Sequence, residues 1–183
     1  MPPGGPQFPR KLVGLAGFMG CGKSTVGRLL AARLGWRFVD LDPLIEERTG
    51  VSIAQIFERL GEPAFREMEH ETLARILGEA AEQGKPTVIA LGGGTFAQPA
   101  SAEMLRGTRC AVVWLKCPPE VLLARCATMT NRPLFRDEAS FLDLYRHRLP
   151  FYEKAEYCVD GNSEPPSVVE RILAQGIFER VSV

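Results

Sequence analysis

The stretch 17-GFMGCGKS-24 decides the fold of this chain. The hydrophobic run 11-KLVGLA-16 precedes it and predicts a β-strand, and 24-STVGRLLAARLG-35 follows with the apolar spacing of a helix that Gly35 can end. A G-x-x-x-x-G-K-S motif between a strand and a helix is typical of a phosphate-binding loop, and this order makes a chance match in a glycine-rich turn the weaker alternative. The sequence therefore predicts a binding site for a nucleoside triphosphate.

The residue types in this loop have physical reasons. Gly17, Gly20 and Gly22 let the backbone curl so that successive N–H groups point at phosphate oxygens, and the start of the helix adds partial positive charge. Lys23 is expected to reach the β- and γ-phosphates, and the Ser24 hydroxyl to bind Mg²⁺. The motif does not say which molecule receives the phosphate.

Two aspartates follow in 38-FVDLD-42, at the end of a strand predicted over 37–42. Side chains alternate along a strand, so we expect Asp40 and Asp42 to leave it on the same side, where their charges repel unless a cation or hydroxyl groups lie between them. Helix capping is the alternative, since Asp42 precedes Pro43 at a strand–helix junction. The pair alone leaves both possibilities open, and the phosphate loop just upstream favours a functional site.

Strands and helices alternate to the end of the chain. Ser52 can cap a helix that Gly61 can stop, and an amphipathic helix follows over 64–84. Further strands are predicted at 87–91, 110–115 and 157–160, and further helices at 120–127, 141–155 and from residue 166. This alternation predicts βαβ units, and hence one α/β domain over residues 1–183 with a parallel, doubly wound sheet. Residues 1–10 are expected to form a disordered tail.

Composition excludes several other classes of protein. Lys and Arg number 22, as do Asp and Glu, so no overall charge attracts nucleic acid or an anionic membrane. No apolar run approaches the roughly 20 residues of a membrane span, and the N-terminus lacks the apolar core of a signal peptide. The five cysteines show no C-x-x-C pair, which favours a reducing cytoplasm over a disulfide framework or a zinc site. We expect a monomer.

Taken together, the motifs of this chain resemble those of the shikimate kinase family. The resemblance runs from about residue 12 to the last helix, and it rests on the order and spacing of GFMGCGKSTVGRLLA, FVDLD, FREMEHE, LGGG, NRPLF and RHRLPFY. It implies a P-loop NTPase fold with a five-stranded parallel sheet and a mobile lid, similar to nucleoside-monophosphate kinases. It also implies ATP-dependent phosphorylation of the 3-hydroxyl of shikimate, a step in the biosynthesis of chorismate and the aromatic amino acids.

The resemblance assigns the donor side of the site. It implies that Asp40 organises Mg²⁺ through water together with Ser24, and that Lys23, Asp42 and Arg132 are catalytic. The ATP-binding residues that it implies are Gly20, Cys21, Gly22, Lys23, Ser24, Thr25, Arg125, Arg132 and Pro166. Arg132 lies in a long polar stretch, which is expected to be the lid over about 126–140. Cys21 replaces the small residue usual in this loop, and we expect its thiol to make the enzyme sensitive to thiol reagents.

The resemblance also assigns the acceptor side, where shikimate would contact Asp42, Arg66, Gly93, Gly94 and Arg148. A carboxylate is well matched by the planar fork of a guanidinium. By sequence alone a solvated arginine on a helix is the favoured alternative for each, and the resemblance reverses that preference. Likewise, the glycines could form a plain flexible turn. Glu69 is expected to hold Arg66 in place, and the aromatic side chains of Phe57 and Phe65 could be pocket wall or core.

Two alternatives to a shikimate kinase stay open on the residues alone. One is a P-loop kinase for another small acceptor, such as a sugar acid or a nucleoside monophosphate. The gluconate kinase pattern after the second strand is absent, and the glycine triplet with the D-x-D pair suits a small polyol better than a nucleotide. The other is a catalytically silent, nucleotide-gated module, which is disfavoured because Lys23, both aspartates and Arg132 are all present.

Overall fold

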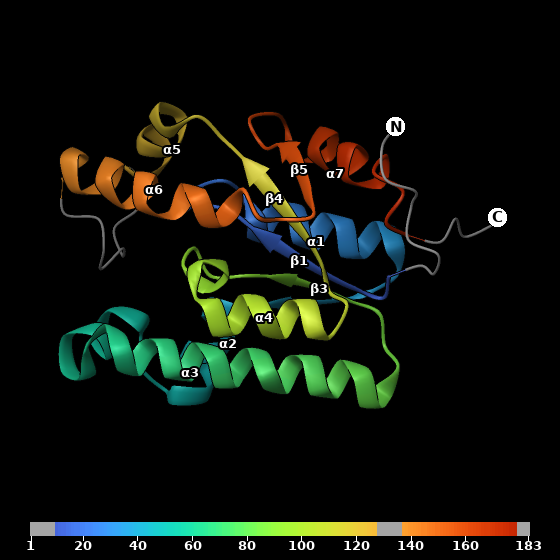
Figure 1. The fold of residues 1–183 in the computed structure, drawn as a ribbon, viewed down its shortest axis with the longest axis horizontal. Coiled ribbons are helices and arrows are strands. Elements are labelled where there is room, and N and C mark those ends of the chain that lie inside the picture. Colours follow the sequence, from blue (N-terminus) through green and yellow to red (C-terminus); the bar gives the residue numbers. More distant parts are fainter. Residues whose placement is uncertain (1–9, 128–136, 179–183) are drawn as a thin grey trace.

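The computed structural model describes residues 10–127 and 137–178, so that nearly all of the predicted tail and most of the predicted lid lie outside the described ranges. Five parallel strands form one sheet in the order β2-β3-β1-β4-β5 (Figure 1). The strands are β1 Leu12–Ala16, β2 Arg37–Asp40, β3 Thr87–Ala90, β4 Ala111–Lys116 and β5 Tyr157–Asp160. The predicted α/β fold with a five-stranded parallel sheet is confirmed.

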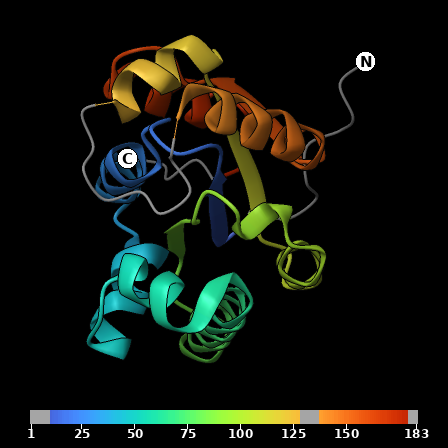
Figure 2. The same cartoon turned by 90° about the vertical axis from the view of Figure 1, so that its left-hand side faces the viewer.

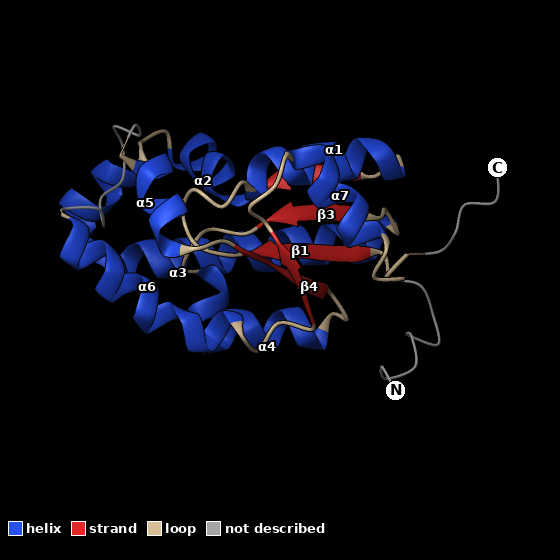
Figure 3. Cartoon of the chain, turned by 90° about the horizontal axis from the view of Figure 1, so that it is seen from above, coloured by secondary structure: helices blue, strands red, loops and turns tan. Residues whose placement is uncertain are grey.

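Helices cover both faces of this sheet. On one face α1 Lys23–Leu34 packs with α7 Pro165–Leu173, and on the other lie α3 Ile53–Gln83 and α4 Pro99–Gly107 (Figure 3). The remaining helical segments are α2 Leu41–Thr49, the short 3-10 segment η1 Thr95–Ala97, α5 Pro119–Cys126 and α6 Glu138–Tyr152. Within the described ranges, no helix combines the length and apolar character that crossing a membrane requires.

Local sequence signals set several helix ends. Gly35 ends α1 in the left-handed conformation, with its N–H donating back to the last turn. At the start of α3 the Gln55 N–H donates to Ser52 Oγ at 3.2 Å, and the Ser52 N–H donates to Gln55 Oε1 at 2.9 Å, which completes a capping box. Gly61 interrupts α3 as predicted, with φ of 81° and ψ of 172°, so α3 consists of the two predicted helices, which meet at a kink at this residue.

The prediction of a strand over 37–42 is wrong at its end. β2 stops at Asp40, and α2 begins at Leu41, so Asp42 lies in the first turn of a helix. Pro43 explains this, because its fixed φ and missing N–H suit the first turn of a helix. The two aspartates therefore do not leave one strand on the same side. Asp40 occupies the N-cap position of α2, but its side chain makes no capping hydrogen bond there.

Two short helices are additional to the predicted elements. α2 follows β2 directly, and α4 begins at Pro99 and connects the glycine-rich turn to β4. α4 is buried only through Ser101, Ala102 and Leu105, so its nine residues give too few apolar positions to show a helical period. Both helices keep the loops at the ends of β2 and β3 short.

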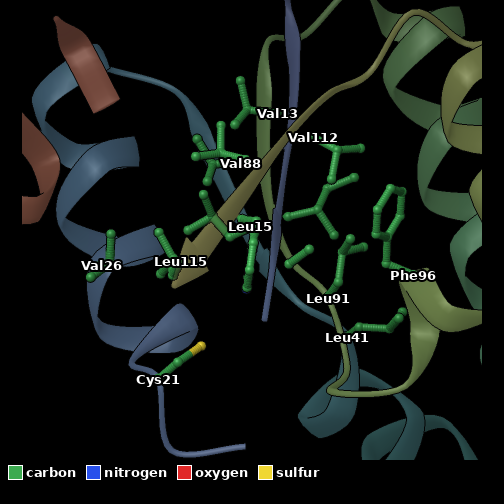
Figure 4. Packing of buried hydrophobic residues seen from close by; sticks show 14 of the residues in the cluster. Val13, Leu15, Cys21, Val26, Leu41, Val88, Leu91, Phe96, Val112 and Leu115 are labelled. Atoms are coloured by element: carbon green, nitrogen blue, oxygen red, sulfur yellow. The ribbon is translucent and has the colours of Figure 1, made fainter. Parts of the chain in front are cut away.

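A single hydrophobic core holds the sheet between its helices. Val26 of α1 lies on one side of the sheet and Phe96 of η1 on the other, with Leu15 of β1 in the middle (Figure 4). All five strands point the same way, so their carboxyl ends meet at one edge, which Figure 2 views. Ligands of open parallel sheets bind at this edge, and the close-packed core holds the loops there in register.

Candidate functional site

Three adjoining cavities open at the carboxyl edge of the sheet. The first, called here the phosphate-loop cavity, is lined by residues from the ends of β1, β2 and β3: Gly20, Gly22, Lys23, Ser24, Thr25, Asp40, Asp42, Leu91 and Gly93. The second, the acceptor cavity, is lined by Met19, Asp42, Ile53, Phe57, Phe65, Arg66, Glu69, Gly93, Gly94 and Arg148. Asp42 and Gly93 line both, so the two cavities meet at these residues.

The phosphate loop has the geometry that its glycines predict. Gly17 and Gly22 have φ of 144° and 93°, which side-chain-bearing residues rarely adopt. A Cβ at Gly17 would also lie 2.9 Å from the carbonyl oxygen of Leu115. The Lys23 ammonium lies inside the curl of the loop, where Nζ donates to the carbonyl oxygens of Gly17 at 2.7 Å and of Phe18 at 3.1 Å. The charged end of Lys23 is thus held at the loop that would surround the phosphates.

The two aspartates have different surroundings. Asp40 lines the phosphate-loop cavity with Ser24, and Asp42 lines that cavity and also the acceptor cavity. A hydroxyl and a carboxylate are the oxygen ligands that Mg²⁺ prefers, so Ser24 and Asp40 fit the metal position implied for them. The separation of the two carboxylates comes from the change of element at Leu41, rather than from the alternation of a strand.

The acceptor cavity is an open pocket with about 440 Å³ of space between its walls, part of which is open to solvent. The structure brings all five predicted acceptor residues together in its lining, from α2, α3, α6 and the glycine-rich turn. Its apolar wall includes Met19, Ile53, Phe57 and Phe65. The sequence suggests only Phe57 and Phe65 for this wall, and it leaves open whether they belong to the wall or to the core. The two rings lie 4.9 Å apart between centroids. Pocket wall and core residues share the same helical spacing, so the sequence pattern does not separate them.

Arg66 is held by two carboxylates on its own helix. Its Nη1 donates to Glu69 Oε2 at 2.8 Å and its Nη2 to Glu62 Oε1 at 3.0 Å. Burial acts to lower the pKa of Arg66, but Glu69 and Glu62 outweigh it and raise the pKa. Glu69 is 1 % exposed and also accepts from Thr95 Oγ1 at 2.6 Å, so the prediction that Glu69 holds this arginine is confirmed. A Cβ at Gly94 would lie 2.5 Å from Arg66 Nη2, which accounts for a glycine there.

Arg148 lies on α6, across the cavity from α3. It is 5 % exposed, so the alternative of a solvated surface arginine is wrong for this residue. Its guanidinium lies 5.6 Å from the centroid of the Phe18 ring, and a Cβ on Gly93 would be 3.4 Å from its Nη1. Burial lowers the pKa of Arg148, yet a guanidinium stays charged at neutral pH. A buried positive charge at the cavity wall is suited to bind an anionic group.

The third cavity, the nucleotide cavity, lies on the other side of the phosphate loop. It is lined by Gly20, Cys21, Gly22, Thr25, Val26, Arg125, Gly161, Asn162, Ser163, Glu164 and Pro165. Arg125 Nη1 donates to the carbonyl oxygen of Gly20 at 3.1 Å, which fixes α5 against the loop. Pro166 is exposed and does not line this cavity, so its contact with the base stays a prediction. The sequence analysis predicts no binding role for the turn 161–165. Its place directly after the strand at 157–160, at the carboxyl edge of the sheet, is the signal that indicates one.

Two further sequence expectations concern the lid and the thiol of Cys21. Arg132 and most of the expected lid fall within 128–136, outside the described residues. The Cys21 side chain is 2 % exposed, and its Sγ lies 3.7 Å from Lys23 Nζ. This burial argues against the expected sensitivity to thiol reagents, because a reagent must reach the sulfur before it can react.

Comparisons with known proteins agree with this geometry. The sequence profile of the family described as shikimate kinase matches residues 19–176. The shikimate kinase of Moorella thermoacetica is 40% identical over 166 residues, which cover 89% of this chain and 92% of that protein. That of Thermodesulfovibrio yellowstonii is 37% identical over 176 residues, or 94% and 97% of the two chains.

A solved structure extends the comparison to the fold. Shikimate kinase from Acinetobacter baumannii in complex with shikimate superposes with a TM-score of 0.85 at 35% identity, covering 96% of this chain and 97% of that one. The match spans nearly the whole of both chains, so it includes the sheet, its helices and the loops that line the three cavities. On the family profile, the relatives and the fold together, this chain belongs to the shikimate kinase family.

Proposed function

We propose that this protein transfers the γ-phosphate of ATP to the 3-hydroxyl of shikimate, giving shikimate 3-phosphate and ADP. The observation that carries the proposal is the meeting of the phosphate-loop and acceptor cavities at Asp42 and Gly93. A phosphate held by the loop and a hydroxyl held in the acceptor cavity would meet at these residues. Phosphoryl transfer depends mainly on such positioning and on charge stabilisation.

On the donor side, the phosphate loop from Gly20 to Thr25 would bind the phosphates through its N–H groups, and Lys23 would stabilise their charge. Arg125 and Pro166 would contact the adenine. Ser24 and, through water, Asp40 would hold Mg²⁺, which would neutralise part of the phosphate charge. Arg132 would complete the charge stabilisation from the lid, over about 126–140.

On the acceptor side, Arg66 and Arg148 approach the cavity from opposite helices and would bind the shikimate carboxylate. Asp42 would accept hydrogen bonds from the ring hydroxyls and orient the reacting one toward the phosphate loop. In a loose transition state this orientation contributes more than the strength of Asp42 as a base. Gly93 and Gly94 leave room for the ring against their backbone.

The proposal extends to the setting in which the enzyme works. We infer a single domain over residues 1–183, active as a monomer in the cytoplasm, with Mg²⁺ as its cofactor and no nucleic acid or membrane as partner. The balance of 22 basic and 22 acidic residues supports the absence of a polyanionic partner. All five cysteines are free, which is consistent with a reducing compartment.

One steady-state assay tests the acceptor. ADP release is measured with Mg-ATP and, in turn, shikimate, gluconate, AMP and CMP. We expect turnover with shikimate alone. The pattern of turnover separates the alternatives: a sugar acid or nucleotide used in place of shikimate would assign a different kinase, and no turnover with any acceptor would favour a silent module.

A further inference from the structure

The phenol of Tyr152 lies directly behind the acceptor cavity. Tyr152 is on α6, one turn beyond Arg148, and it is 1 % exposed. Its ring stacks on Trp114 with 6.0 Å between centroids and 26° between planes. Its hydroxyl donates to the carbonyl oxygen of Gly93, and Gly93 lies beside the guanidinium of Arg148, since a Cβ on Gly93 would be 3.4 Å from Arg148 Nη1. Tyr152 itself does not line the cavity, so it reaches the site only through these two residues.

The two arginines of the cavity are held in different ways. Arg66 makes ion pairs with Glu69 at 2.8 Å and with Glu62 at 3.0 Å. Within residues 10–127 and 137–178, no ion pair joins Arg148 to an acidic side chain, and the side chain one turn further along α6 is that of Tyr152, whose hydroxyl is neutral. A hydroxyl can orient a guanidinium without neutralising it. Arg148 therefore keeps its charge available for an anionic ligand, whereas the charge of Arg66 is already compensated.

We propose that Tyr152 is a positioning residue for acceptor binding, which fixes the guanidinium of Arg148 and the Gly93 turn in the geometry that receives the carboxylate of the substrate. The inference rests on the proposed role of Arg148. A buried arginine on a helix has several rotamers, and a fork matches a carboxylate in only a narrow range of orientations. Burial raises the pKa of Tyr152, so its hydroxyl stays protonated and keeps its donor to Gly93 at working pH.

Tyr152→Phe tests the role with the smallest change, because it keeps the ring on Trp114 and removes only the hydroxyl. We expect the KM for shikimate to rise about tenfold, as for the loss of a buried hydrogen bond that leaves the Gly93 carbonyl unsatisfied. The kcat and the KM for ATP should change by less than about twofold. Tyr145→Phe is the matched control: Tyr145 is on the same helix, its hydroxyl donates to Cys117 O at 3.5 Å, and its loss should leave all three constants unchanged.

A neutral acceptor separates positioning from general weakening of the fold. The methyl ester of shikimate lacks the carboxylate charge, so Tyr152→Phe should change its KM, or its Ki if it is not turned over, by less than about twofold. An equal rise for the acid and the ester, or a lowered Tm with unchanged KM for the acid, would show that the hydroxyl is merely structural and overturn the inference.

Arg148→Ala, measured in parallel, distinguishes the inference from the function on which it rests. If Arg148→Ala raises the KM for shikimate and Tyr152→Phe does not, the inference fails and the carboxylate role of Arg148 stands. If Arg148→Ala leaves that KM unchanged, the carboxylate role fails and the inference fails with it.

Discussion

Replacing Glu69 by Gln should weaken both the fold and the acceptor site. The Glu69 carboxylate accepts from Arg66 at 2.8 Å and from Thr95 at 2.6 Å in a buried position. Gln keeps the size of the side chain but removes its charge. Hydrogen bonds to charged groups contribute about 1.5–3 kcal/mol and neutral ones about 1 kcal/mol, so the two bonds together should lose about 2–3 kcal/mol. For a chain of this length that lowers Tm by about 4–12 °C.

The measurement is thermal unfolding by circular dichroism together with the shikimate KM. We expect that KM to rise about fivefold or more, because Arg66 then keeps only an exposed partner and is less well oriented. Glu62→Gln is the matched control, since Glu62 pairs with the same arginine at 3.0 Å but is 48% exposed. It should change the free energy of unfolding by less than about 1 kcal/mol. Equal effects of the two substitutions would refute the argument that burial of Glu69 gives this pair its strength.

Three further predictions concern single features of the site. Asp40→Asn should mainly raise the Mg²⁺ concentration needed for half-maximal activity. Asp42→Asn should mainly raise the shikimate KM, because of the two aspartates only Asp42 lines the acceptor cavity. Identical kinetic profiles for the two variants would contradict this division. Gly94→Ala places a Cβ 2.5 Å from Arg66 Nη2, so it should displace that guanidinium and raise the shikimate KM about tenfold; an unchanged KM would count against it. In the native enzyme an aromatic disulfide reagent should rapidly label only Cys158, without loss of activity, because the other four cysteines are buried. Rapid inactivation with the label on Cys21 would contradict this expectation.

The features predictable from the sequence depend on near neighbours in the chain. The phosphate loop, the glycine end of α1 and the Ser52 cap of α3 all form within a few residues, and each is present as expected. The alternation of strands and helices predicts the class of fold but not the order of the strands in the sheet. The number of strands came from the family resemblance. The boundary at Asp40 was misplaced because FVDLD has an alternating pattern while the following proline starts a helix.

The sequence by itself determined that this protein holds a nucleotide on a parallel sheet, and through its motifs it predicted five residues that line the acceptor cavity. Only the tertiary structure decided how those residues are fixed around one cavity, because the side chains next to them are held in turn by contacts with distant parts of the chain. Glu69 meets Thr95 from a different element, and Tyr152 on α6 meets Gly93 after β3. Periodicity reports that a side chain is buried, but not whether it faces the core, a cavity or another charge. The unequal pairing of Arg66 and Arg148 is therefore a property of the packed fold.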